Sequence, residues 1–295
     1  MLAKVAVIIP TYNRWPVVKA AIDSVLNQSY TNVECVLVDD GSTDGSFEAL
    51  HAHYGSKIVL LRNEENREKS YSRNAGVKVT DAEFVCFLDS DDLLLESSIE
   101  NRMKFFKAGV NVVYGRTESD KKHTTEKLNG RSDTPAYRLT LEDYLHNTSC
   151  VHTTGFTVRR SFMLEYGMYN ESLTNLEDLE LFIRLLCHSE FVFCGQTVSV
   201  LRGVASSRAR DNWKKIIAQS GKLSEALSTN PTVTKRLGDQ LNQMLKRDGE
   251  ELLRALYRSK RGVDYRSAFM RIRSNGIPVS SFKNIKRFCL SYLWN

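Results

Sequence analysis

Short apolar runs that end in polar residues recur along the first third of the chain, and segments with helical spacing separate them. The runs VAVII, ECVLV, KIVLL and EFVCFL are each followed by a polar stretch. Between them, apolar residues recur every three to four positions, as in WPVVKAAIDSVLNQ. This alternation is typical of βαβ units, because parallel neighbouring strands need a helical crossover. It predicts an α/β fold with a mostly parallel sheet.

Unusual polar residues follow these predicted strands directly. Pro10 to Asn13 follow the first strand, which the proline is expected to end, Asp39 and Asp40 follow the second, and Asp89 to Asp92 follow the fourth. In such sheets ligands bind at the carboxyl ends of the strands. Crowded carboxylates resist ionising together unless a cation or several donors compensate them. The sequence therefore predicts one site at this edge, although Asp39 and Asp40 would also suit an ordinary turn.

Two common phosphate-binding loops and the usual metal-ligand spacings do not occur. The chain has no G-x-G-x-x-G after its first strand and no G-x-x-x-x-G-K-[ST], which argues against a dinucleotide dehydrogenase and a P-loop NTPase. His152 and His188 lack metal-ligand spacing, so we expect structural or surface roles for them. The six cysteines form no C-x-x-C pair and are predicted to be small buried side chains.

The middle of the chain divides into a polar and an apolar part. Residues 115–145 are polar and punctuated by Gly and Pro, which indicates a loop or an excursion between core elements. NLEDLELFIRLL predicts a largely buried helix with Glu177 and Asp178 in its first turn. EFVFCGQTVSVLRG then predicts a strand pair or hairpin.

From Ser206 onward the chain is basic and helical in pattern. This region has 19 Lys and Arg against 7 Asp and Glu, whereas residues 1–205 have 22 against 28. A solvated helical face would explain the charge, while nucleic-acid binding lacks a recognisable module and is not expected. The final stretch, SFKNIKRFCLSYLWN, places aromatic residues on one helical face beside Lys and Arg, which favours association with an anionic membrane surface.

Five segments together resemble the family-two glycosyltransferases with a GT-A fold, over about residues 4–205. They are VIIPTYNR, VDDGSTDGS, SRNAGVKVTDAEFVCFLDSDD, RRSFMLEYGMYNESL and NLEDLELFIRL, in the family's order and approximate spacing. The resemblance implies a GT-A domain over residues 1–205, followed by a basic helical region over 206–295. It implies an inverting transfer of sugar from a nucleotide-diphosphate sugar, most simply a UDP-sugar.

The resemblance also implies roles for individual residues. Asp89-Ser90-Asp91 matches the D-x-D element, in which the first aspartate faces the ribose and the later one, Asp91, ligates Mn²⁺ or Mg²⁺. Asp178 matches the general base. The remaining matches belong to the binding of the nucleotide sugar, and they are Pro10, Tyr12, Asn13, Asp39, Asp40, Arg73 and Glu177.

Elementary chemistry agrees with these roles. A diphosphate leaves during the transfer, and a hard cation held by one or two carboxylates neutralises its charge. A second carboxylate must accept the proton of the acceptor hydroxyl, and a helix N-terminus favours its ionised form. Taken alone, Glu177 and Asp178 would be ordinary helix-start residues and Arg73 a solvated helix residue.

One segment departs from the family pattern. Many relatives carry a histidine in a Y-R-x-H-like stretch, where this chain has Leu201-Arg202-Gly203-Val204. We expect the chain to do without that histidine or to use another group, such as Arg202, Arg208 or Arg210.

The expected biological setting is bacterial surface polysaccharide synthesis, such as O-antigen or capsule. The acceptor would be a saccharide or a lipid-linked saccharide. No signal peptide or membrane span is recognisable, so we expect a cytoplasmic protein that can lie on the inner face of the cell membrane. A non-catalytic nucleotide-sugar-binding protein and a nucleotidyltransferase are the alternatives, although PTYNRW is not the Gly-rich phosphate loop that the latter would need.

Overall fold

The computed structural model describes residues 2–119, 135–146, 150–202 and 213–243, with four single positions nearer the C-terminus. The chain divides into two compact units. The first consists of residues 1–171 and 181–205, and the second of residues 172–180 and 206–295. The predicted domains 1–205 and 206–295 stay a prediction, and the predicted amphipathic stretch at the C-terminus lies outside the described residues.

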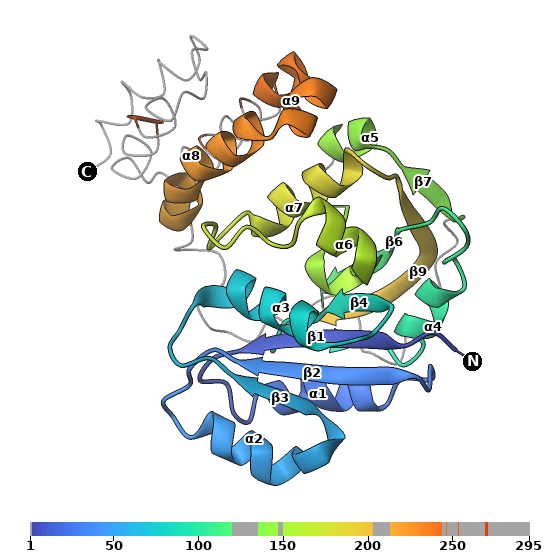
Figure 1. Ribbon diagram of the computed structural model, residues 1–295, viewed down its shortest axis with the longest axis vertical. Coiled ribbons are helices and arrows are strands. Elements are labelled where there is room, and N and C mark those ends of the chain that lie inside the picture. Colours follow the sequence, from blue (N-terminus) through green and yellow to red (C-terminus); the bar gives the residue numbers. More distant parts are fainter. Residues whose placement is uncertain are drawn as a thin grey trace. The chain divides into compact units, whose positions relative to one another are not determined.

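One curled sheet forms the first unit (Figure 1). Among the described residues it has nine strands in the order β3-β2-β1-β4-β8-β6-β9-β5, and β7 pairs with β9. Strands β3, β2, β1 and β4 are parallel, β8 runs against both of its neighbours, and β6 is parallel to β9. The predicted α/β fold with a mostly parallel sheet is confirmed. The strands are β1 (Val5–Thr11), β2 (Val33–Asp39), β3 (Val59–Arg62), β4 (Phe84–Phe87), β5 (Leu93–Leu94), β6 (Val112–Ser119), β7 (Tyr137–Leu139), β8 (Phe156–Arg159) and β9 (Phe191–Leu201).

Helices connect these strands and continue into the second unit. Helices α1 to α3 are the crossovers that the parallel strands require. No helix in the described part of the chain is long and apolar enough to cross a membrane. The helices are α1 (Val18–Leu26), α2 (Ser46–Tyr54), α3 (Glu68–Val79), α4 (Ser98–Met103), α5 (Leu141–His146), α6 (Arg160–Tyr166), α7 (Glu177–Leu186), α8 (Trp213–Thr229) and α9 (Pro231–Leu237).

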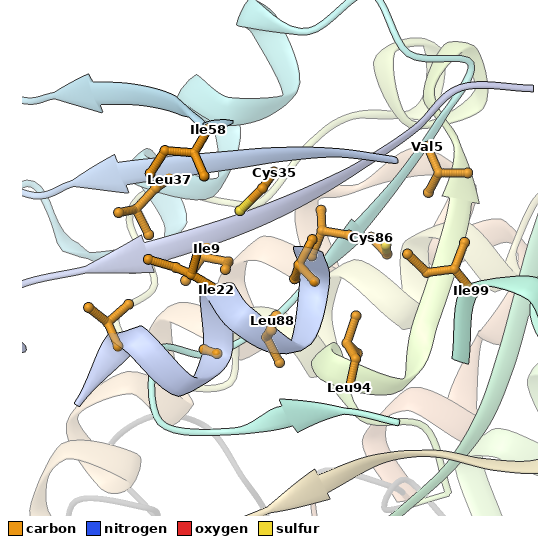
Figure 2. Packing of buried hydrophobic residues seen from close by; sticks show 14 of the residues in the cluster. Val5, Ile9, Ile22, Cys35, Leu37, Ile58, Cys86, Leu88, Leu94 and Ile99 are labelled. Carbon is orange, nitrogen blue, oxygen red and sulfur yellow. The ribbon is translucent and has the colours of Figure 1, made fainter. Parts of the chain in front are cut away.

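Strand β1 is buried on both faces, which explains why its sequence is a continuous apolar run. On one face Val5 and Ile9 join a cluster that includes Ile22 of α1 and Leu37 of β2 (Figure 2). On the other face α3 approaches so closely that a Cβ on Gly76 would lie 2.5 Å from Cγ2 of Ile8. The two faces fix β1 at the centre of the parallel strands.

The expectation that Pro10 ends the first strand is wrong. Strand β1 continues to Thr11, and Pro10 is paired with Val38 of β2. The carbonyl oxygen of Ile8 accepts a hydrogen bond from the N–H of Leu88, so the polar backbone groups of Pro10, two residues later, face the β4 side. Because β4 itself ends at Phe87, no ladder bond is lost there when proline lacks an N–H.

Two further expectations need correction. EFVFCGQTVSVLRG forms the single strand β9, because Gly195, at φ 75°, makes an irregularity within the strand instead of a turn. Residues 115–145 include the end of β6, β7 and α5.

Candidate active site

The polar residues that follow the parallel strands meet at one edge of the sheet. Thr11 at the end of β1 is paired with Asp39 at the end of β2. The N–H of Asp40 then donates to the carbonyl oxygen of Thr11, with 2.8 Å between the nitrogen and the oxygen. Asp89 follows β4, the neighbour of β1 on its other side. The structure thus brings together the strand-end residues that the sequence singled out.

The first loop is held against the turn after β2. The N–H of Asn13 donates to Oγ of Ser42 over 2.9 Å, and its Oδ1 accepts from the N–H of Thr43 over 2.9 Å. Asn13 adopts a left-handed conformation, with φ 50°. The neighbouring ring of Tyr12 is 41% exposed. An exposed aromatic ring on a fixed loop can stack against a flat ligand, as the predicted role of Tyr12 requires.

Asp39 and Asp40 are both buried, and each is satisfied by hydrogen bonds. Asp39 accepts bonds from the N–H and Oγ of Ser42. Oδ1 of Asp40 accepts from the side chain of Asn63, the N–H of Arg67 and the hydroxyl of Ser72, at 2.7, 3.0 and 2.9 Å. These bonds hold the carboxylates in place. Contact with a nucleotide base stays a prediction for both aspartates.

Arg73 is buried and is therefore not a solvated helix residue. Its Nη2 lies 2.7 Å from Oδ1 of Asp89, and its guanidinium stacks over the ring of Tyr169. Burial raises the pKa of Asp89, but the charges of Arg73 and then of Lys69 outweigh burial and lower the pKa to about 2. Asp89 is thus ionised at neutral pH and fixed in orientation by α3.

Two more arginines surround the second and third aspartates of this turn. Nη1 of Arg14 lies 3.2 Å from Oδ2 of Asp91, a side chain that is only 5% exposed. The backbone N–H of Arg202 donates to Oδ1 of Asp92 over 3.3 Å, and its Nε donates to the carbonyl oxygen of Asp91 over 3.2 Å. Arg202, which the sequence suggested as a substitute for the missing histidine, lies at this turn. Arg14 was not anticipated, and its only signal was a basic residue just beyond the end of the first strand.

A divalent cation fits this turn only with help from a ligand. Among the described residues, no three or more His, Cys, Asp or Glu side chains are grouped so that they could hold a metal ion. Carboxylate oxygens such as those of Asp91 are nevertheless the ligands that Mg²⁺ and Mn²⁺ prefer, and Mg²⁺ is commonly bound by one or two carboxylates plus substrate phosphates. The residues present therefore suit a cation that is shared with a diphosphate.

Glu177 and Asp178 begin α7, as predicted, and both belong to the second unit. Leu176, at φ 65°, precedes the helix, and Oδ1 of Asp178 accepts a hydrogen bond from the N–H of Leu179 over 2.8 Å. Glu177 is 2% exposed, whereas Asp178 is half-buried. The helix N-terminus stabilises their negative charge. The role of Asp178 as a base stays a prediction.

The two lone histidines have structural partners. Nδ1 of His152 accepts a hydrogen bond from the N–H of Thr154 over 3.2 Å and thereby caps a short 3₁₀ turn (Thr153–Gly155). The ring of His188 stacks on Tyr166 with 3.9 Å between ring centroids. The described cysteines are free thiols, and three of them are buried, namely Cys35, Cys86 and Cys194.

Comparison with known families identifies the first part of the chain. The family described as Glycosyl transferase family 2 matches residues 6–167, which is more than half of the chain. The chain belongs to this family. Three of the five segments that suggested the resemblance lie wholly within the matched residues.

Family members with curated descriptions match only segments of the chain. An uncharacterized glycosyltransferase of Rickettsia bellii is 36% identical over 115 residues, which are 39% of this chain and 16% of that protein. The Escherichia coli protein WfgD, described as a UDP-Glc:alpha-D-GlcNAc-diphosphoundecaprenol beta-1,3-glucosyltransferase, is 34% identical over 115 residues, which are 39% of this chain and 46% of that protein. The matches thus span less than half the length of these relatives.

Solved structures of other proteins that resemble this chain confirm its GT-A fold. S. aureus TarS superposes with a TM-score of 0.66 and 16% identity, over 99% of this chain and 53% of TarS. The mannosyltransferase PcManGT from Pyrobaculum calidifontis, in complex with GDP-Man and Mn²⁺, gives a TM-score of 0.56 and 15% identity, over 99% of this chain and 80% of PcManGT. At these identities the likeness is one of fold.

Proposed function

We propose that this family-2 chain is an inverting, metal-dependent glycosyltransferase. It would move a sugar from a UDP-sugar to a saccharide or a lipid-linked saccharide. The observation that carries this proposal is the set of strand-end carboxylates at one edge of the GT-A sheet, with Asp89 and Asp91 each paired to an arginine. Such a set suits a nucleotide diphosphate, which needs both hydrogen-bond acceptors for its nucleoside and cations for its phosphates.

The names of relatives support the donor class. WfgD is named as a UDP-Glc-dependent enzyme, and TarS residues 1–349 have been crystallised with UDP-GlcNAc. PcManGT instead holds GDP-Man and Mn²⁺. We favour UDP because two of these three proteins are associated with it. Asp39 and Asp40 would accept hydrogen bonds from the base, and Tyr12 would stack on it.

The chemistry follows from the charges of the chain's own groups. Asp91 would hold Mn²⁺ or Mg²⁺, which supplies positive charge to the departing diphosphate. Arg73 keeps Asp89 ionised and in place, and Asp89 would face the ribose. Asp178 would accept the proton of the acceptor hydroxyl as its oxygen attacks the anomeric carbon. A single displacement of this kind inverts the configuration of that carbon.

The acceptor side rests on relatives and on the basic region. The name of WfgD includes a diphosphoundecaprenol-linked sugar as its acceptor. Residues 206–295 carry 19 basic and 7 acidic residues, which suits attraction to anionic lipid. We therefore place the reaction at the inner face of a bacterial membrane, in surface polysaccharide synthesis.

A donor screen tests the proposed function. The full chain is incubated with UDP-Glc, UDP-GlcNAc, UDP-Gal and GDP-Man, with Mn²⁺, with Mg²⁺ or with EDTA, and donor binding and nucleotide diphosphate release are measured. We expect one UDP-sugar to bind and to be turned over only with a divalent cation. If a donor binds but is neither hydrolysed nor transferred when a saccharide acceptor is added, the chain is a non-catalytic nucleotide-sugar-binding protein. If no donor binds in a metal-dependent way, the proposal is wrong.

A further inference from the structure

A pocket of about 330 Å³ lies in the first unit, beside strands β6, β7 and β9. No step of the proposed function uses it. Its walls combine aromatic rings with hydrogen-bonding side chains, which is the composition typical of small-molecule sites. The lining residues include Tyr114, Arg116, Thr117, Tyr137, His152 and Phe193.

Three aromatic rings from neighbouring strands form the apolar part of this pocket. Phe193 of β9 is paired in register with Tyr114 of β6 on one side and with Tyr137 of β7 on the other. The rings of Tyr114 and Tyr137 lie 5.2 and 5.1 Å from that of Phe193, and a 2.9 Å hydrogen bond joins the two tyrosine hydroxyls. Tyr114 is 1% exposed, whereas Tyr137 is 43% exposed. Tyr137 is thus the ring of this row most accessible to a ligand.

An irregularity of the sheet shapes the polar part. Between Tyr114 and Arg116 strand β6 advances two residues, while β9 advances four, from Phe193 to Thr197, with Gly195 at φ 75°. Such irregularities bend strands and redirect side chains, and they occur often beside active sites. Here Arg116 and Thr117, which are consecutive residues of β6, both line the pocket.

His152 adds a hydrogen-bond donor. Its Nδ1 accepts from the N–H of Thr154, so in the neutral ring the proton is carried by Nε2. Arg116 and Thr117 add a guanidinium and a hydroxyl. Donors and a hydroxyl beside exposed aromatic surface match a ligand that has hydroxyl groups around an apolar ring face.

The pocket lies at the same edge of the sheet as the strand-end aspartates. Strand β8 runs against both β4 and β6, so β6 and β4 point the same way. Leu201, which lines the pocket, directly precedes Arg202, whose N–H binds Asp92. Three sites therefore lie in order along this edge. Asp39 and Asp40, proposed to bind the base, are at the end of β2. The turn proposed to bind the diphosphate is at the end of β4, and the pocket lies on β6 and β9.

We propose that this pocket binds a pyranose ring of the saccharide acceptor, stacked on Tyr137 and hydrogen-bonded by Arg116, Thr117 and His152. That the bound saccharide is the acceptor rests on the proposed function, whereas the binding of a saccharide in this pocket does not. A pocket of this volume holds one ring and not a long oligosaccharide, because sites for drug-sized ligands begin at about 300 Å³.

Saturation-transfer NMR with four methyl pyranosides tests the inference on the full chain, without donor or metal. The probes are the methyl glycosides of glucose, galactose, mannose and N-acetylglucosamine. We expect at least one to receive saturation from the protein. Tyr137→Ala should reduce this transfer by about three- to tenfold, because it removes the stacking ring, whereas Tyr137→Phe keeps the ring and should retain it.

Tyr12→Ala is the matched control, because Tyr12 is an equally exposed aromatic residue at the predicted base site. It should leave glycoside binding unchanged. Absence of transfer to all four probes, or equal transfer with Tyr137→Ala, would overturn the inference. Glycoside binding that persists while no nucleotide sugar binds would support the saccharide pocket and reject the donor proposal, so the two failures are distinguishable.

Discussion

Three arginines from different parts of the chain contact the turn that carries Asp89, Asp91 and Asp92. Arg14 follows β1, Arg73 belongs to α3, and Arg202 follows β9. A guanidinium stays charged at any physiological pH and offers several donors in a fixed plane. The turn after β4 therefore has positive charge of its own before any cation or donor binds.

Replacing Arg14 should strengthen the binding of metal alone. Nη1 of Arg14 lies 3.2 Å from Oδ2 of Asp91, so a cation held by Asp91, as proposed, would compete with this guanidinium. In Arg14→Gln we expect Mn²⁺ to bind about two- to fivefold more tightly in the absence of nucleotide, because a partly exposed ion pair contributes up to about 1 kcal/mol. Titration of Mn²⁺ followed by electron paramagnetic resonance measures this affinity.

Lys19→Gln is the control for this experiment. Lys19 pairs with Asp23 on the surface of α1, so the substitution removes the same charge without touching Asp91. It should leave Mn²⁺ affinity unchanged. Equal or weaker Mn²⁺ binding by Arg14→Gln would show that Arg14 does not compete with the cation.

Asp89 should stabilise the fold in a pH-dependent way. Its folded pKa of about 2 lies below the ordinary value of 3.8, so its ionised form adds stability above about pH 4, which is lost as the pH falls toward 2. Because a third of the side chain is exposed, we expect only about 1 kcal/mol. Urea unfolding of the protein and of Asp89→Asn from pH 2.5 to 5 should show a difference that shrinks toward low pH. A constant difference would contradict the assignment.

Asp178→Asn should strongly reduce transfer and retain donor binding. The amide cannot accept a proton, and loss of a general base lowers rates by about 10²- to 10⁴-fold. Sugar transfer and donor affinity are measured side by side. Glu142→Gln is the matched control, because Glu142 is also the second residue of its helix, α5, but is exposed. Retained transfer in Asp178→Asn would remove Asp178 from the mechanism.

For single residues, the sequence predicted the aspartates of the site but not the arginines that contact them. Asp39, Asp40, Asp89 and Asp91 follow predicted strands, so their common edge could be inferred from the parallel order alone. Arg14 is separated from Asp91 by 77 positions and Arg202 by 111. A single sequence has no local signal for pairs so far apart, because such contacts depend on tertiary packing.

Helix α3, which carries Arg73, packs closely on β1. Gly76→Ala would place a methyl group against Ile8, and overpacking of this kind costs about 1–3 kcal/mol. Ile8→Ala alone opens a cavity and should cost about 2–5 kcal/mol. In the double variant the new methyl group occupies part of that cavity, so its loss of stability should be less than the sum. Chemical denaturation of all four proteins measures this coupling, and strict additivity would contradict the close contact.

Among the elements, those with clear periodicity could be predicted and those with irregular pairing could not. The alternation from β1 to β4 follows from helical spacing and short apolar runs. Gly195 looks like a turn residue in the sequence, yet it occupies an irregularity inside β9, since a left-handed glycine serves either purpose. Polar residues at the end of β6 concealed a strand whose pairing partner, β9, lies far along the chain.

On the scale of the whole molecule, charge is unequally distributed along the chain. Residues 1–205 are acidic on balance, whereas residues 206–295 carry 12 more basic than acidic residues. Many of those basic positions lie outside the described residues, so their role is argued from sequence. Positively charged Lys and Arg side chains attract anionic lipid, and added salt weakens this attraction.

Removal of residues 279–295 should weaken binding to anionic vesicles. Co-sedimentation with phosphatidylglycerol vesicles compares the full chain, the shortened chain and the variant Lys283→Gln, Lys286→Gln, Arg287→Gln. Each basic residue near the surface contributes about 1 kcal/mol, so the triple variant should also bind less, and least at high salt. Unchanged sedimentation of the shortened chain would reject a membrane role for this segment.

The order of the strands also sets the distance between the ends of the candidate site. Strands β2, β1, β4, β8 and β6 are successive neighbours, so four spacings separate the end of β2 from the end of β6. At 4.7–4.9 Å per spacing, that distance along the sheet is about 19 Å. A sugar 1-phosphate is too short to reach both ends, whereas a nucleotide sugar followed by an acceptor ring is several groups long. Length alone would therefore let this edge reject truncated donors that carry the correct sugar.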